Sequence, residues 1–237
     1  TVKHTEYKPA LQSVYNLEVK DYHTYFVGQQ GALVHNGSKR TCGKTDIKKN
    51  TLPTHSAEVK KALMEAESSI VGKPIETGFV IDDTGKVLVK RSADVDTPNK
   101  IVFDEDELTK FKGNIFTHNH PSNLPLGPED VATGIAHQVR EIRAVGEEFT
   151  SVIKLSDETL DSLTRYKGDF PSAYGYVDNL QKQSMQKVIA KFKAGEIVPP
   201  TGLSPAQLQY WRVNQVLEEI VKSLPGATLE TIPTKLL

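Results

Sequence analysis

The chain has almost no cysteine. Its 237 residues include one, Cys42, which excludes a disulfide framework and a zinc site built from several thiolates. Apolar runs are short, and none approaches the roughly 20 residues that a membrane-spanning helix requires. No basic-then-apolar leader opens the sequence, so any export is expected to depend on a longer parent protein. Neither sign of charge dominates, and the net charge is −1. The chain therefore has no general attraction for nucleic acid.

Glycine-rich phosphate loops, dinucleotide fingerprints and internal repeats are also absent from the sequence. What remains is the composition of an ordinary globular protein, with 38% hydrophobic and 25% charged residues. The length exceeds that of a typical single domain. Strand and helix patterns both occur, and together they predict an α+β protein.

The first informative stretch is near the start. Residues 14–27 alternate apolar and polar side chains, Gln29-Gln30-Gly31 can turn the chain, and residues 32–35 form a second short apolar run. This pattern predicts a β-hairpin that ends in His35-Asn36. An asparagine amide can attack its own backbone carbonyl and cut the chain after itself, while a neighbouring imidazole protonates the leaving amine. An ordinary hairpin with this ending is the alternative.

The same stretch, over residues 12–36, resembles the two closing motifs of a Hint (hedgehog/intein) domain, of the kind found upstream of C-terminal toxin domains in Rhs/YD-repeat and related polymorphic toxins. The resemblance implies that Asn36 cyclises, that His35 assists it, and that His23 is a candidate base. The nucleophile-bearing first part of a Hint domain is not included, so splicing is not expected, whereas cleavage after Asn36 does not require that part. The resemblance also implies that the protein is a secreted effector carried by the delivery shell of the parent toxin. Such an effector acts in the target-cell cytoplasm and is neutralised by a cognate immunity protein.

Residues 37–53 follow the expected cleavage site. They are basic and partly glycine-rich, which is typical of a flexible linker. A nucleic-acid-binding arm is the alternative.

From residue 54 the pattern predicts an ordered domain. Thr54 or Ser56 can cap a first helix, and Asp83-Thr84-Gly85 is a strong hairpin signal between two strands. The predicted helices up to residue 156 span 56–69, 104–111 and 128–138, and the predicted strands span 76–82, 86–90, 114–117 and 139–145.

The second informative stretch is His118-Asn119-His120-Pro121. Two residues apart on an extended segment, His118 and His120 project to the same face, and Pro121 turns the chain out of the strand. Asp130 follows in the first turn of a helix that begins at Pro128. Two imidazoles and one carboxylate leave a fourth tetrahedral position open, which is typical of catalytic zinc sites. An incidental histidine pair is the alternative.

The order of these elements resembles the JAMM (MPN-plus) metallopeptidase core over roughly residues 56–156. The resemblance implies that His118, His120 and Asp130 bind Zn²⁺ and that Glu76, which opens a strand, acts on the attacking water. The chain departs from the family in having one residue fewer between the second histidine and the aspartate, and Gly127 where the family has a serine. Ser122 is the candidate to supply the missing hydroxyl. Alternatives to Glu76, on the preceding helix, are Glu65 and Glu67.

The predicted function is therefore that of an antibacterial toxin domain, a zinc-dependent peptidase or isopeptidase that acts on a protein substrate. A nuclease toxin, either an RNase or a DNase, is the alternative, because a histidine pair can also act as a general base on phosphodiesters while a cation clamps the phosphate. An ADP-ribosyltransferase toxin is a further alternative. The composition does not decide between these chemistries, although the near-neutral charge leans slightly against nucleic acid.

After residue 156 the pattern is helical. Helices are predicted over 157–167, 176–194 and 204–223, and we expect residues 157–237 to form a helical extension of the toxin domain. Their apolar stripes are predicted to face the core, and a binding groove for a partner is the alternative for the last stripe. The predicted inward residues are Leu180, Met185, Val188, Ile189, Phe192, Tyr210, Trp211, Val213, Val216, Leu217, Ile220 and Val221.

Overall fold

The computed structural model describes residues 24–27, 32–35 and 55–234. The chain divides into two compact units, residues 1–50 and 51–237, and each is described by itself. In the first unit β1 (Thr24–Val27) pairs antiparallel with β2 (Ala32–His35). The predicted hairpin is thus confirmed for these two strands. His23, Asn36 and the predicted linker lie outside the described residues.

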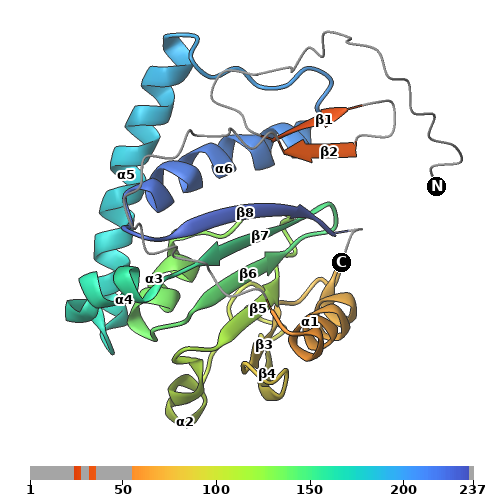
Figure 1. Ribbon diagram of the computed structural model, residues 1–237, viewed down its shortest axis with the longest axis vertical. Coiled ribbons are helices and arrows are strands. Elements are labelled where there is room, and N and C mark those ends of the chain that lie inside the picture. The colour runs from red at the N-terminus through yellow and green to blue at the C-terminus, as the bar shows by residue number, and fades with distance from the viewer. Residues whose placement is uncertain (1–23, 28–31, 36–54, 235–237) are drawn as a thin grey trace, which may run out of the picture. The chain divides into compact units, whose positions relative to one another are not determined.

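The second unit is built on one mixed sheet of six strands (Figure 1). The strands lie in the order β4-β3-β5-β6-β7-β8, and of these neighbours β5 and β6 alone are parallel. Helices accompany this sheet, which confirms the α+β class. The strands are β3 (Thr77–Ile81), β4 (Val87–Ser92), β5 (Ile115–Asn119), β6 (Glu141–Val145), β7 (Phe149–Lys154) and β8 (Thr228–Pro233).

Side chains at the first turns explain where several helices begin. Ser56 accepts a hydrogen bond from the Val59 N–H, and Asp104 accepts one from the Glu107 N–H. Three of the longer helices place proline in their first turn, where no N–H is required. The helices are α1 (Ala57–Ile70), α2 (Glu105–Leu108), η1 (Thr109–Phe111), α3 (Pro128–Ala136), α4 (Asp157–Ser162), η2 (Thr164–Tyr166), α5 (Phe170–Lys193) and α6 (Pro205–Lys222).

Helices cover both faces of the sheet, so that the second unit has three layers. Alternate residues of each strand point to opposite faces. Phe79, Ile115 and Val145 pack with α1 on one face, whereas Phe116 and Ile142 pack with α3, α5 and α6 on the other. His118 therefore faces α3, and its neighbours Thr117 and Asn119 face the α1 side.

Two features after residue 156 differ from the sequence-based prediction. The predicted helical extension also contains a strand, β8, which pairs antiparallel with β7 at the edge of the sheet. Met185, Ile189 and Phe192, predicted to face the core, are 47%, 47% and 54% exposed.

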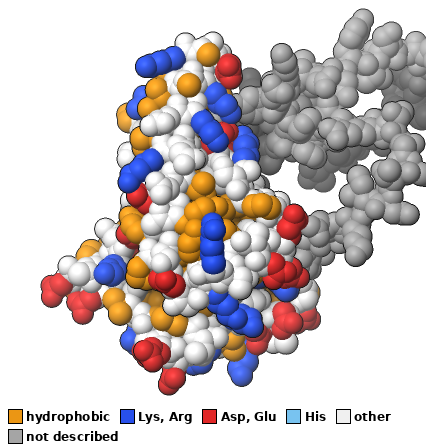
Figure 2. Space-filling model, turned by 90° about the vertical axis from the view of Figure 1, so that its left-hand side faces the viewer, with side chains coloured by type: hydrophobic (Ala, Val, Ile, Leu, Met, Phe, Trp, Pro, Cys, Tyr) orange, Lys and Arg blue, Asp and Glu red, His pale blue; other side chains and the backbone are white. Residues whose placement is uncertain are grey.

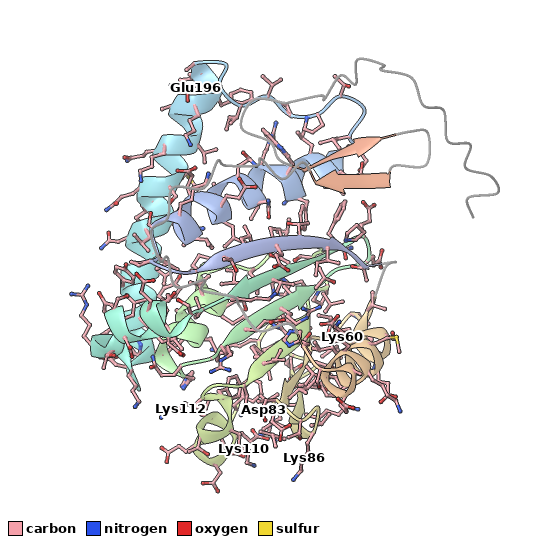
Figure 3. All side chains as sticks on the ribbon, in the orientation of Figure 1. Lys60, Asp83, Lys86, Lys110, Lys112 and Glu196 are labelled. Carbon is pink, nitrogen blue, oxygen red and sulfur yellow. The ribbon has the colours of Figure 1, made fainter. Side chains whose placement is uncertain are left out.

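The reason for this exposure is the position of α5. The helix begins at Phe170 rather than Tyr176, packs against α3 in its first half, and extends past the sheet in its second half (Figure 1). Glu196, just beyond its end, lies far from the sheet (Figure 3). Among the described helices none has the length and apolar character needed to cross a membrane.

Candidate metal centre

The candidate centre forms where β5 ends and α3 begins. Because β5 and β6 are parallel, the chain crosses over between them, and α3 forms this crossover. Ligands in such sheets bind at the carboxyl ends of the strands, next to the start of the following helix. His118 lies at that end of β5, His120 follows it, and Asp130 lies in the first turn of α3. The predicted helix start at Pro128 is confirmed.

Three side chains converge at this point. His118, His120 and Asp130 each offer a ligand atom, and these atoms all lie within 4.8 Å of one another. The two histidine Nε2 atoms are 2.9 Å apart. Asp130 Oδ1 lies 3.1 Å from His118 Nε2, and Oδ2 lies 3.5 Å from His120 Nε2. The structure thus brings together the three residues predicted as ligands, and this group could hold a metal ion.

Neighbouring groups fix the orientation of these three side chains. His120 Nδ1 lies 2.9 Å from the Leu124 carbonyl oxygen, and donating its proton there leaves Nε2 free to bind. The Gly127 N–H donates to Asp130 Oδ2 at 2.7 Å. The His118 ring stacks on Phe116 at 4.7 Å, while its Nδ1 is buried without a hydrogen-bond partner among residues 55–234. Both of the predicted ligand histidines therefore direct Nε2 into the cluster.

The electrostatics of the cluster favour a positive charge. Burial by itself would lower the pKa of His120, but the charge of Asp130 and hydrogen bonds to Asp130 and Leu124 raise it to about 9. Burial by itself would raise the pKa of Asp130, but His118 and His120 hold it well below its usual range. A proton or a metal ion can supply the positive charge that His118, His120 and Asp130 favour.

Glu76 lies beside the cluster without being one of its three converging residues. It precedes β3, and because Gly78 pairs with His118 across the antiparallel β3–β5 ladder, Glu76 comes to the same end of the sheet. Burial raises the pKa of Glu76, the charges of the two histidines partly offset this, and the charge of Asp130 adds to it. A carboxylate with a raised pKa beside a candidate cation site is suited to proton transfer.

Asn119 holds the segment that carries Glu76. Its side chain is buried on the α1 side of β5, where Oδ1 accepts the Thr77 N–H at 2.8 Å. Its Nδ2 donates to the carbonyl oxygens of Lys73 and Ile75 at 3.0 and 3.3 Å. No sequence motif marks Asn119, and its position between the two histidines is the signal that the sequence offers.

The two glutamates predicted as alternatives to Glu76 lie on α1. Glu67 faces the α1 side, where it accepts a hydrogen bond from Thr117 Oγ1 at 2.9 Å and pairs with Arg143. Glu65 is exposed and lies 3.9 Å from Lys61. Neither glutamate therefore replaces Glu76. Ser122 is exposed on the loop after β5, and its hydroxyl accepts a hydrogen bond from the Leu124 N–H at 3.4 Å.

Comparisons with known proteins add no relative. No family model, no curated protein and no solved structure matches the chain. The assignment of a function therefore depends on the residues of the centre and on the sequence motifs.

Proposed function

We propose that residues 51–237 form a zinc-dependent peptidase or isopeptidase, and that this unit is the active part of a polymorphic toxin. The supporting observation is the convergence of His118, His120 and Asp130 with Glu76 beside them. Two imidazoles and one carboxylate with an open fourth position are typical of catalytic zinc sites. The order of the elements around them also agrees with the resemblance of the sequence to the JAMM (MPN-plus) core.

In this proposal His118 Nε2, His120 Nε2 and an oxygen of Asp130 hold the zinc ion. When bound, zinc supplies Lewis-acid chemistry that polarises a carbonyl and makes water more acidic. Glu76 takes a proton from the attacking water and passes it to the leaving amine nitrogen. Its raised pKa brings the carboxyl closer to neutral pH, where one group can both accept and give a proton. The Ser122 hydroxyl is the proposed donor to the amide oxygen.

Metal analysis combined with activity tests the reaction. We expect the purified chain to hold one equivalent of zinc and to cleave proteins. Glu76→Gln should keep the zinc and lose turnover, because Glu76 moves protons without being a ligand, whereas His118→Ala should lose both. Glu65→Gln, an exposed glutamate on α1, is the matched control and should keep both.

Two outcomes would contradict this assignment. Fully active protein without metal would remove the role of zinc. Degradation of RNA or DNA with the protein pool intact would favour a nuclease, and modification of the target without cleavage would favour an ADP-ribosyltransferase.

We also propose that the parent toxin is cut after Asn36 and that an immunity protein neutralises the released unit. The support is the Hint-like motif that ends in His35-Asn36. The parent should yield a fragment that begins at Gly37, as N-terminal sequencing can show, and Asn36→Ala should abolish it. Cleavage that is unchanged by this substitution would refute the assignment of Asn36.

A further inference from the structure

An apolar groove lies between α5 and α6, close to the candidate metal centre. Its volume is about 480 Å³, within the usual range for ligand sites. Met185, Ile189 and Phe192 contribute from α5, and Trp211 and Val216 contribute from α6. The three α5 side chains are each about half exposed, so the groove is open to a ligand. On the α5 side of the molecule, apolar side chains gather with both basic and acidic side chains around them (Figure 2).

The loop that shapes the metal centre also lines the groove. Leu126, Gly127 and Pro128 line the groove. The same loop supplies the Leu124 carbonyl oxygen that lies 2.9 Å from His120 Nδ1, and the Gly127 N–H that donates to Asp130. A ligand in the groove therefore contacts the loop that positions two of the three candidate metal ligands.

The charge of the groove restricts its occupant. Lys193 and Arg212 are its charged lining residues, and both are basic. A nucleic acid would find these two cations, but it would also place phosphates and sugars against a mainly apolar wall, which costs desolvation without hydrogen bonds in return. An apolar segment with a neighbouring carboxylate matches both features of the groove.

We propose that this groove is the substrate-binding site of the protease: it takes an apolar polypeptide segment flanked by acidic residues, and the adjoining residues of that polypeptide reach the His118, His120 and Asp130 centre. This inference rests on the proposed function and specifies its substrate class. Substrate binding remote from the reacting bond also gives a physical basis for selecting some proteins over others.

Trp211 fluorescence can report binding in the groove, because Trp211 is the single tryptophan of the chain and lines the groove. The experiment uses the full chain with Glu76→Gln, so that binding is measured without turnover. Three ten-residue peptides serve as probes: a leucine- and valine-rich core with glutamate flanks, the same core with lysine flanks, and a serine- and glutamine-rich core with glutamate flanks. We expect a saturable change in Trp211 fluorescence with the first, and at least tenfold weaker binding of the other two.

Substitutions locate the binding. Met185→Asp should weaken binding of the first peptide at least tenfold, whereas Met64→Asp should not, since Met64 is also 47% exposed but lies on α1 outside the groove. The pair Lys193→Glu with Arg212→Glu should reverse the preference for flanking charge. Lys187→Glu, an exposed lysine of α5 outside the lining, is the control for that change.

Several results would overturn the inference. Equal binding of the three peptides, or no binding of any of them, would refute it. A fluorescence change that depends on protein concentration alone would identify a second copy of the chain as the occupant. Equally tight binding of a nonionic detergent would show that the groove does not select a polypeptide. Binding is read without metal or turnover, so the two proposals fail separately. Peptide binding without any protease activity refutes the proposed function, and protease activity without peptide binding refutes the groove.

Discussion

Two histidine nitrogens 2.9 Å apart are the central feature at the scale of residues. If the two nitrogens pointed their lone pairs at each other, they would repel. A proton or a metal ion therefore has to lie between the two nitrogens. The pKa of His120 of about 9 means that the metal-free cluster holds a proton at neutral pH. Metal binding and proton binding therefore compete for the same atoms.

This competition gives the first prediction. Zinc binding at pH 7 should release about one proton, and the affinity should rise with pH until the His120 pKa is passed, because a metal ligand must be deprotonated. Isothermal titration in two buffers of different ionisation enthalpy measures the number of protons. At pH values above the His120 pKa the number of protons released should fall, because His120 is then already deprotonated. Binding at pH 7 with no proton release would contradict the prediction.

Asn119 gives the second prediction. Asn119→Ala leaves the buried Thr77 N–H and two carbonyl oxygens without their partner, and a buried unsatisfied group costs about 1–3 kcal/mol. We expect a loss of this size in the free energy of unfolding, measured with denaturant, and a lower kcat with zinc content unchanged, because the Glu76 segment is held less firmly. Asn99→Leu, at an exposed position, should change neither. A variant as stable and as active as the parent would exclude this role.

The contrast between these residues shows what the sequence could and could not provide. His118, His120 and Asp130 lie within thirteen positions of one another, and strand and helix geometry alone predicts that they meet. The partners of Asn119 are Thr77, Lys73 and Ile75, more than forty positions away. Only the antiparallel pairing of β3 with β5 brings them together, and no local pattern encodes that pairing.

At the scale of elements, α1 is joined to the sheet by buried charges as well as by apolar packing. Arg143 on β6 pairs with Glu67 on α1 and with Glu141 at 2.8 Å. Glu141 Oε2 also lies 2.8 Å from His55 Nε2, just before the helix. Burial by itself would raise the pKa of Glu141, but His55 and Arg143 outweigh this and lower it.

The third prediction concerns this network. Arg143→Met should cost about 3–5 kcal/mol of unfolding free energy, because it leaves the Glu67 carboxylate buried without its cation and takes from Glu141 one of its two partners. The triple change Arg143→Met, Glu67→Leu and Glu141→Leu should recover most of that loss. Arg140→Met, at an exposed arginine, is the control. A single variant that is as stable as the parent would show that water reaches these carboxylates.

The same network sets the fourth prediction, the response to acid. A carboxyl with a lowered folded-state pKa stabilises the fold above its unfolded pKa, about 4.3 for glutamate, and this contribution is lost as the pH falls through the lower folded value. Denaturant unfolding between pH 7 and pH 3 should therefore show a smaller loss of stability for Glu141→Gln than for the parent. An unchanged pH dependence would exclude Glu141 as a source of acid sensitivity.

The elements that differ from the sequence-based prediction, α5 and β8, differ for one reason. The apolar stripe of α5 has helical spacing along its whole length, but spacing identifies a face and not what covers it, and the half with Met185, Ile189 and Phe192 extends past the sheet. β8 is a polar, half-exposed edge strand that ends in Pro233, so its alternation is weak. In both cases the missing information is the position of a distant neighbour.

At the scale of the whole molecule, the proposals concern one unit that carries both the centre and the groove, preceded by a hairpin that ends at the expected cleavage site. If that unit is a toxin, its effect in a cell should be lost when the centre is lost. The net charge of −1 gives the chain no general attraction for nucleic acid, which disfavours non-specific nucleic-acid binding as a source of toxicity.

The last prediction follows from this. Expression of residues 1–237 inside a bacterium that lacks a cognate immunity protein should stop growth, change the protein pool and leave total RNA and DNA intact. Glu76→Gln and His118→Ala should restore growth at equal soluble expression, whereas Glu65→Gln should remain toxic.

Asn36→Ala separates release from catalysis. Continued toxicity would show that the unit acts without being cut free, and lost toxicity with an uncut chain would show that release is required. Normal growth with folded, zinc-loaded parent protein at high level would refute the toxin assignment and leave the metal centre to another role.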